Sequence, residues 1–207
     1  MRKQDALFIL FFGTLWGAVE AILGGALYQA DVPHASVPVT IIGFCILTVA
    51  RFYFPRPGSS TLIASCAMLY KFFNSPFFAC HLLGIFLLGL SYDLVYSRFK
   101  VRGHVPTAAA AVAATYLGYA LFAVLITYVF RYSYWADVGL PKVLRYIGVS
   151  GTMAAAGNAV LVPLAALAAR DLRTRAAGLS AFRARLAVGG ASLLTAALWV
   201  LCVTVSF

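Results

Sequence analysis

The chain has 207 residues, of which 63% are apolar and only 11% are charged. An ordinary globular chain has roughly 45–50% apolar and about 25% charged residues, so this composition excludes a disordered protein, a nucleic-acid-binding module and a disulfide-stapled secreted domain. The formal net charge of +10 arises from 16 Lys+Arg against 6 Asp+Glu, and in so apolar a chain these charges distinguish the two faces of a membrane. The sequence predicts an all-α, polytopic helical membrane bundle.

Seven apolar segments follow one another along the chain, and a membrane-spanning helix needs about 20 such residues. The first segment follows Arg2 and Lys3 as a signal peptide would, but Glu20 interrupts its apolar run, so we predict an uncleaved first helix. We predict one integral membrane domain over residues 1–207, with a six-helix core and a seventh, C-terminal helix. The segments are 6–28, 36–54, 59–73, 77–97, 107–130, 143–169 and 184–206.

The basic residues set the predicted orientation, because cytoplasmic loops of membrane proteins are enriched in Lys and Arg. If segment 59–73 alone failed to cross, the excess of Lys and Arg on the cytosolic side would shrink, so we reject that arrangement. A re-entrant hairpin of segments 59–73 and 77–97 would preserve the excess and stays open at this point. We therefore predict a multi-pass protein of the cell membrane with a cytosolic N-terminus and an external C-terminus. This topology places twelve of the 16 basic residues inside and four outside, namely Lys71, Arg131, Lys142 and Arg145.

Small residues form a regular stripe along the first segment. Gly13, Gly17, Ala21 and Gly25 recur every four residues, which places them on one face of a helix. Small residues at this spacing let a second backbone approach closely, so the stripe predicts a helix-docking face. The docked helix belongs either to this chain or to a separate subunit, and both interpretations stay open.

Polar residues inside the apolar segments are the candidates for a binding site, because a charge in hydrocarbon must be paired, neutralised or hydrated. Glu20 lies in the outer half of the first segment, and Lys71 lies near the outer end of the third. The two form either a structural ion pair or part of a ligand site that opens outward. The other candidates for this site are Trp16, Asn74, His81 and Asn158.

Other charged residues have simpler interpretations. Asp93 lies near the inner end of the fourth segment, where we predict a structural ion pair with a neighbouring arginine rather than a proton relay. The Arg-rich stretch 170–185 is interpreted as an inner loop, with contact to anionic lipid or a cytosolic partner as the alternative. The four cysteines lie in apolar runs without metal-ligand spacing, so we predict buried thiols and no metal site. The candidate partners of Asp93 are Arg51, Arg56 and Arg98.

One short motif points to catalysis. Gly148-Val149-Ser150-Gly151 matches the G-x-S-G string that holds the serine of rhomboid intramembrane proteases, whose partner histidine lies on a later helix. His34, His81 and His104 all precede Ser150 here, so we do not expect proteolysis. The sequence also contains no H-E-x-x-H motif and no phosphate-binding P-loop. We therefore predict no enzymatic activity, no catalytic residues and no ATP hydrolysis by this chain.

With these features the chain resembles the S component of energy-coupling factor (ECF) transporters, the small membrane subunit that captures a vitamin or a metal. The resemblance rests on size, on a six-helix core without an ATPase and on the phrase Leu15-Trp16-Gly17-Ala18-Val19-Glu20-Ala21 followed by Gly24. It covers about residues 6–170. In that family a small-residue motif on the first helix docks onto the transmembrane coupling subunit. The resemblance gives this role to Gly13, Gly17, Ala21 and Gly25.

The resemblance also implies an outward-facing pocket capped by the loop between the first two helices, here residues 29–35 with Asp31 and His34. The seventh segment, 184–206, is a departure from the six-helix family. We expect the substrate-specific subunit of a modular ATP-driven uptake transporter for a small, vitamin-like solute. Its expected partners are that solute, the lipid bilayer and a coupling subunit with cytosolic ATPases, with no cofactor and no nucleic acid. The alternative is a membrane scaffold or assembly protein whose intramembrane charges are structural.

Overall fold

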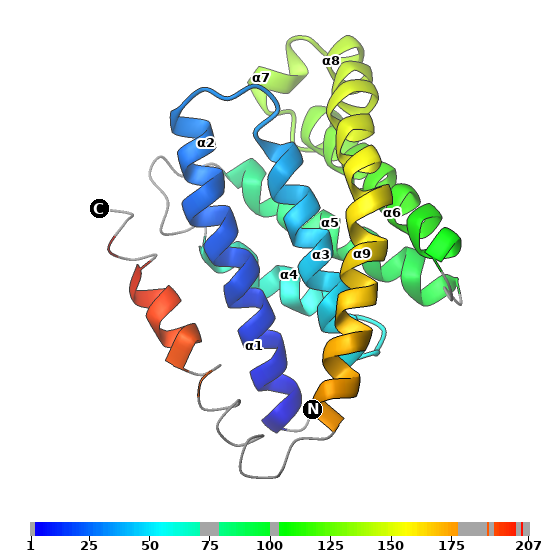
Figure 1. Cartoon of the computed structure of the whole chain (residues 1–207). Helices are drawn as coiled ribbons and strands as arrows, with labels where there is room; N and C mark the ends of the chain where they lie inside the picture. Colours follow the sequence, from blue (N-terminus) through cyan, green and yellow to red (C-terminus); the bar gives the residue numbers. More distant parts are fainter. Residues whose placement is uncertain are drawn as a thin grey trace.

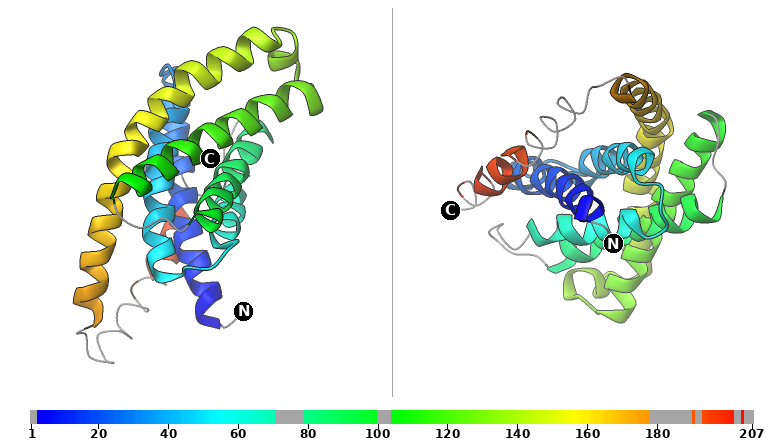
Figure 2. Two further views of the ribbon diagram at one scale, coloured as in Figure 1. Left: turned by 90° about the vertical axis from the view of Figure 1, so that its right-hand side faces the viewer. Right: turned by 90° about the horizontal axis from the view of Figure 1, so that it is seen from below.

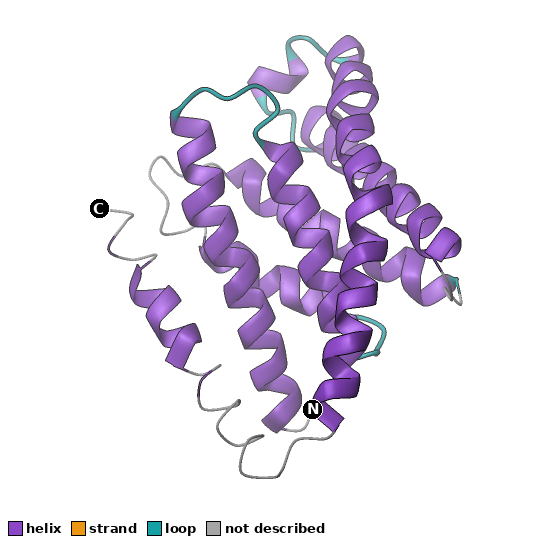
Figure 3. Ribbon diagram, viewed as in Figure 1, coloured by secondary structure: helices purple, strands orange, loops and turns teal. Residues whose placement is uncertain are grey.

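The structure is a computed structural model of the whole chain, and it describes residues 3–70, 79–99, 104–177, 190, 193–201 and 204. The regular elements within these residues are all helices (Figure 3). We call the end of the bundle that carries residues 30–35 the outer end and the opposite end the inner end, after the predicted orientation. In Figure 1 the outer end is at the top.

The first two apolar segments form two long helices that run side by side. α1 (Lys3–Ala18) continues through a π-helical turn, η1 (Val19–Gly24), into α2 (Gly25–Gln29), and together they give a membrane-length helix over Asp5–Gln29. α3 follows at Ser36–Tyr53, after the loop of residues 30–35. Both predicted segments, 6–28 and 36–54, are confirmed to within a few residues.

α4 is shorter than the sequence predicts. It covers Ser59–Leu69, which at 1.5 Å per residue is about 16 Å, roughly half of the hydrocarbon core of a bilayer. The predicted segment 59–73 is therefore not a membrane-length helix within the described residues, and its last residues, with Lys71, lie outside them. The apolar pattern was correct, but it gave no signal for where the helix stops.

α5 (Ala79–Arg98) crosses the whole bundle. Near its start His81 stacks on Tyr28 of α2 at the outer end, with ring centroids 4.7 Å apart. Near its other end Asp93 contacts Arg51, close to the inner end of α3. A helix that joins the two ends in this way is a transmembrane span, not one arm of a re-entrant hairpin.

The remaining described spans are longer than the predicted segments. α6 (His104–Val124) continues into a second π-helical turn, η3 (Leu125–Val129). After the short α7 (Ser133–Ala136), one continuous helical stretch contains α8 (Leu140–Arg145), η4 (Tyr146–Gly151) and α9 (Thr152–Ala177). Pro141 stands in the first turn of this stretch, where its missing N–H costs nothing. The predicted boundaries 143–169 were thus too narrow at both ends.

The protein is a multi-pass membrane protein with five membrane-length apolar helices among its described residues. The sequence predicted seven spans, and α4 accounts for one of the differences. The seventh segment is described only in part, with helical residues at 193–201, so its crossing and the external position of Phe207 stay predictions.

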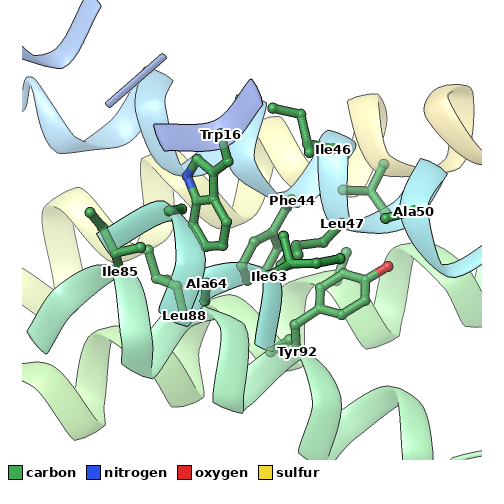
Figure 4. Packing of buried hydrophobic residues seen from close by; sticks show 14 of the residues in the cluster. Trp16, Phe44, Ile46, Leu47, Ala50, Ile63, Ala64, Ile85, Leu88 and Tyr92 are labelled. Carbon is green, nitrogen blue, oxygen red and sulfur yellow. The ribbon is translucent and has the colours of Figure 1, made fainter. Parts of the chain in front are cut away.

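The core forms where α1, α3, α4 and α5 meet, with α3 between α1 and α9 when the bundle is seen from below (Figure 2). Large side chains from all four helices interlock there, and small residues allow close approach beside them (Figure 4). In a bilayer such packing, rather than exclusion of water, holds helices together. The fully buried large side chains of this core include Trp16, Phe44, Leu47, Ile63 and Tyr92.

An inner polar network fixes the start of the short helix. Asp93 Oδ1 lies 2.7 Å from Arg51 Nη1, and Asp93 Oδ2 accepts hydrogen bonds from the Thr61 backbone N–H at 2.6 Å and the Thr61 hydroxyl at 2.8 Å. Arg51 also donates to the Ser97 hydroxyl at 2.9 Å. The carboxylate thus satisfies the first turn of α4, where unpaired N–H groups attract negative charge. The predicted structural pairing of Asp93 is confirmed, with Arg51 as the partner.

Candidate functional site

The outer end of the bundle concentrates the irregular helical geometry of the described structure. η1, η3 and η4 all lie in the outer parts of their helices, close to the loops at the top of Figure 1. A π-helical turn holds an extra residue and is frequent at functional sites, because it redirects side chains that an α-helix would space evenly. The three π-helical turns therefore make the outer end the candidate location of a binding site.

Polar and aromatic side chains from five elements converge there. Tyr28 stacks on His81, and Tyr119 of α6 stacks on Tyr146 of η4 with ring centroids 4.9 Å apart. Tyr28 lies close enough to Tyr119 and Tyr146 for their phenols to interact electrostatically, which joins the two stacks. Trp135 packs edge-on against Tyr146 at 5.1 Å and closes one side. We call Glu20, Tyr28, His81, Tyr119 and Tyr146 the outer cluster.

Glu20 is the charged member of the outer cluster. It projects from η1, its residue is only 7% exposed, and its carboxyl group lies within electrostatic range of the Tyr28 and Tyr119 phenols. A carboxylate at this depth is costly unless polar groups surround it, and phenol hydroxyls are suitable hydrogen-bond donors. The predicted pairing with Lys71, and the predicted contribution of Asn74, lie outside the described residues.

The loop of residues 30–35 is fastened over the outer end by one hydrogen bond. His34 Nδ1 and the Ser150 hydroxyl of η4 lie 2.8 Å apart. Asp31 and His34 both have positive φ, 49° and 57°, a backbone region that non-glycine residues rarely occupy. Strain of this kind persists only where the surrounding structure enforces it, and it is concentrated at functional sites.

The contact between His34 and Ser150 corrects one step of the sequence argument. A histidine that precedes the G-x-S-G serine in the chain does reach its hydroxyl group. Ser150 nevertheless lies inside a continuous helical stretch, where the backbone N–H groups are engaged in the helix. Stabilising an acyl-transfer intermediate needs free donors directed at the developing oxyanion. The contact therefore fastens a loop and does not by itself form a hydrolytic centre.

Two predicted site residues lie deeper than the outer cluster. Trp16 is fully buried against Gly43 of α3, and Asn158 is fully buried on α9, where its amide nitrogen donates to the Thr115 hydroxyl at 2.8 Å. Among the described residues, the indole N–H of Trp16 and the amide oxygen of Asn158 have no hydrogen-bond partner. Because nearly all buried polar groups are hydrogen-bonded, these two atoms are exceptions within the described residues.

The small-residue stripe of α1 faces different neighbours along its length. A methyl group on Gly13 would collide with Cys66 and one on Gly17 with Tyr70, so α4 packs directly on this part of the stripe. Ala21 packs with Tyr70, Leu198 and Trp199, while Gly25 is half-buried at the start of α2. Contacts within the chain therefore explain Gly13 and Gly17, and docking of a separate subunit stays a prediction.

Tyr28, Tyr119 and Tyr146 were missed by sequence reasoning. Each interrupts an otherwise apolar stretch in the outer half of a span, and this shared depth is the signal that identifies them. From sequence alone, aromatic residues in the outer half of a span are most simply interpreted as interface anchors. Stacking between helices, however, depends on which face each tyrosine occupies, and that follows from helix packing.

Comparison with known proteins does not place the chain in a family, because no family model, no curated protein and no solved structure matches it. What the structure establishes is the architecture of the chain. It is a helical, multi-pass membrane protein whose outer end gathers a carboxyl group, three phenols and an imidazole under a fastened loop.

Proposed function

We propose that the chain captures a small organic solute from the outer side of the membrane at the outer cluster. The observation that carries this proposal is the convergence of Glu20, Tyr28, His81, Tyr119 and Tyr146 beneath a loop that His34 fastens to Ser150. Binding sites are typically built from aromatic walls and a few well-placed polar groups. A purely structural end of a bundle has no need for a strained loop held down by a single hydrogen bond.

The side chains of the cluster indicate the kind of solute. Flat rings stacked in pairs present faces and edges beside which a planar or aromatic group packs. The carboxylate of Glu20 accepts hydrogen bonds and favours a cationic or donor-rich group, while the phenols both donate and accept. A planar solute with hydrogen-bond donors, in the size range of a vitamin, fits this chemistry.

The resemblance to ECF S components extends the proposal to transport. In this extension the chain is the substrate-specific subunit of a modular uptake transporter, and a coupling subunit with cytosolic ATPases supplies the energy. The loop of residues 30–35 is the element that the resemblance assigns to capping the pocket, and its fastening by His34 supports that assignment. Gly25, which is half-buried at the start of α2, is the stripe residue that a coupling subunit would contact.

A matched pair of tyrosine variants tests solute capture. The Tyr119 phenol shares a hydrogen bond with Thr40 at 3.3 Å, and the Tyr116 phenol, on the same helix, shares one with Thr152 at 2.8 Å. Each Phe substitution removes one hydroxyl group and its hydrogen bonds, but only Tyr119 belongs to the outer cluster. The detergent-purified protein is extracted, and small molecules that copurify are quantified by mass spectrometry.

We expect Tyr119→Phe to lower the affinity for the copurifying solute about two- to tenfold, and the retained amount with it, because a lost hydrogen bond to a bound polar group costs about 0.5–1.5 kcal/mol. Tyr116→Phe should retain as much solute as the wild type. Equal retention by both variants would contradict capture at this cluster. A protein that carries no solute, even from cells grown in rich medium, would favour a scaffold or assembly role.

A further inference from the structure

An apolar groove runs along the lipid-facing side of α3. α3 forms its floor with Ile42, Cys45 and Val49, and the walls come from α1 and α9, which lie on either side of α3 (Figure 2). Its volume is about 260 Å³, and every lining residue belongs to a membrane-spanning helix. The groove is therefore in contact with the hydrocarbon of the bilayer and not with water. Phe12 and Leu15 of α1 and Leu161 of α9 complete the lining.

The dimensions of the groove select its occupant. Its floor extends from Ile41 to Val49, about 12 Å at 1.5 Å per residue. A volume of about 260 Å³ over that length is too small to hold a helix, which with its side chains is about 10–12 Å across. A helix from a partner or from a second copy of the chain does not fit into such a slot. A single extended hydrocarbon chain does.

A positive charge stands at the inner end of the groove. Phe52 lies three residues after Val49 on the same face of α3, and the Arg170 guanidinium lies over its ring, 5.7 Å from the centroid. Arg170 is exposed at the inner end of α9. Its sequence neighbour Asp171 lies about 100° further round the helix. An arginine in this position has the geometry to hold a phosphate with two parallel hydrogen bonds.

We propose that this groove binds one anionic glycerophospholipid of the inner leaflet, with an acyl chain against α3 and its phosphate at Arg170. The apolar slot and the arginine are aligned along the membrane normal, as the tail and headgroup of a lipid are. The leaflet on the predicted cytosolic side carries the anionic lipids that attract basic residues. The proposal does not depend on solute capture, because the groove and the outer cluster share no residue.

Native mass spectrometry of the whole chain tests the site directly. The protein is reconstituted in vesicles of equal parts phosphatidylglycerol and phosphatidylcholine, then released into detergent, and the retained lipids are counted. Cys45→Phe fills the floor of the groove, and Val124→Phe places the same aromatic ring at an exposed position on α6. Arg170→Gln removes the charge, and Arg98→Gln is its control at the same end of the bundle.

We expect the wild type, Val124→Phe and Arg98→Gln to retain one phosphatidylglycerol. Cys45→Phe should lower this occupancy about tenfold, and Arg170→Gln should abolish the preference for phosphatidylglycerol while some lipid stays bound. Wild-type occupancy equal to that of Cys45→Phe, or a preference unchanged in Arg170→Gln, would overturn the proposal.

A labelling experiment on the wild-type chain covers the case in which Cys45→Phe does not fold. Phosphatidylglycerol with a photoreactive group in its acyl chain is incorporated into the vesicles and activated by light. Cross-links should be concentrated at Phe12, Leu15 and residues 41–49, and an excess of unlabelled phosphatidylglycerol should suppress them. Labelling spread evenly over all lipid-facing helices, or labelling of the groove that an excess of unlabelled phosphatidylglycerol does not suppress, would exclude a lipid site.

Discussion

Asp93 is a buried charged residue that holds the start of α4 in place. Its two carboxylate oxygens are divided between Arg51 and the first turn of α4, so a single residue links α3, α4 and α5 at the inner end. Removing one partner of a buried ion pair leaves an uncompensated charge, which costs about 3–5 kcal/mol. Asp93 is therefore a structural residue, and its loss should weaken the packing of α3, α4 and α5 together.

Asp93→Asn should lower the melting temperature of the detergent-solubilised protein markedly. The substitution keeps the size of the side chain but strands Arg51 and weakens the interaction with the start of α4. Asp5→Asn is the control, because the Asp5–Arg56 pair at 3.0 Å involves a half-exposed arginine, and exposed pairs are worth only about 0–1 kcal/mol. Circular dichroism during heating measures the melting temperature of both variants. Equal melting temperatures for the two variants would contradict the structural role of Asp93.

Glu20 is the residue at which structural and binding roles separate most clearly. Glu20→Gln preserves its shape and removes its charge. If Glu20 binds solute, the variant should melt as the wild type does when neither carries solute, and it should lose most of the copurifying small molecule. If Glu20 serves a structural ion pair with Lys71, the variant should melt at a lower temperature and retain any bound solute. Lys71→Met is measured in parallel. It should also lower the melting temperature and retain bound solute only if Glu20 and Lys71 form a structural ion pair.

At the level of elements, α1 and α4 are bound together through the small-residue stripe. The Tyr70 hydroxyl donates to the Thr14 hydroxyl at 2.7 Å, and Gly17 provides the space in which the Tyr70 ring lies. This contact holds one side of the short α4 against a full-length span. Since α4 is too short to cross a membrane by itself, its position depends on such lateral contacts.

Gly17→Ala should therefore destabilise the protein, because the added methyl group collides with the Tyr70 ring, and overpacking a filled core typically costs about 1–3 kcal/mol. Gly148→Ala is the matched control, since a methyl group there meets open space, and alanine favours helix by up to about 1 kcal/mol. Thermal melting in detergent compares the two. A Gly17→Ala protein that melts normally and still carries solute, but fails to support uptake in cells, would instead indicate a docking face for a separate subunit.

The sequence predicts the spans well because apolar runs and their interruptions are local properties. The positions of α1 to α3 and the pairing of Asp93 followed from such properties. The outer cluster was anticipated at Glu20 and His81, whereas Tyr28, Tyr119 and Tyr146 are brought together by helix packing. Asn158 was found by its polarity, but its partner Thr115, 43 positions away, was not predictable from spacing.

At the scale of the whole molecule, the two ends of the bundle differ in character. The inner end holds the ion pairs of Asp93 and Asp5, and the outer end holds the stacked aromatic rings and the strained loop. A structural network at one end leaves the other end available for binding. The proposed lipid site in the inner leaflet would be a further feature of the inner end that the outer end lacks.

Fusion reporters test the orientation that underlies this description. With a cytosolic N-terminus, a reporter that is active only outside the cytosol should be active when inserted after Gly139 and inactive when fused before Met1. Fused after Phe207 it should be active if the seventh segment crosses. Activity at the N-terminus and none after Gly139 would invert the whole molecule and move the outer cluster to the cytosolic face.

The helical stretch that ends the described bundle has a further consequence for its surroundings. Residues 146–169 carry no charge and are flanked by Arg145 and Arg170, and at 1.5 Å per residue they measure about 36 Å. The hydrocarbon of a typical bilayer is only about 30 Å thick, so this helix is longer than the bilayer and spans it with some tilt or thickens the bilayer around it. Tyr146 stands at one end of this helix. The helix that carries one wall of the outer cluster is thus sensitive to bilayer thickness, and a thicker membrane would reduce the mismatch.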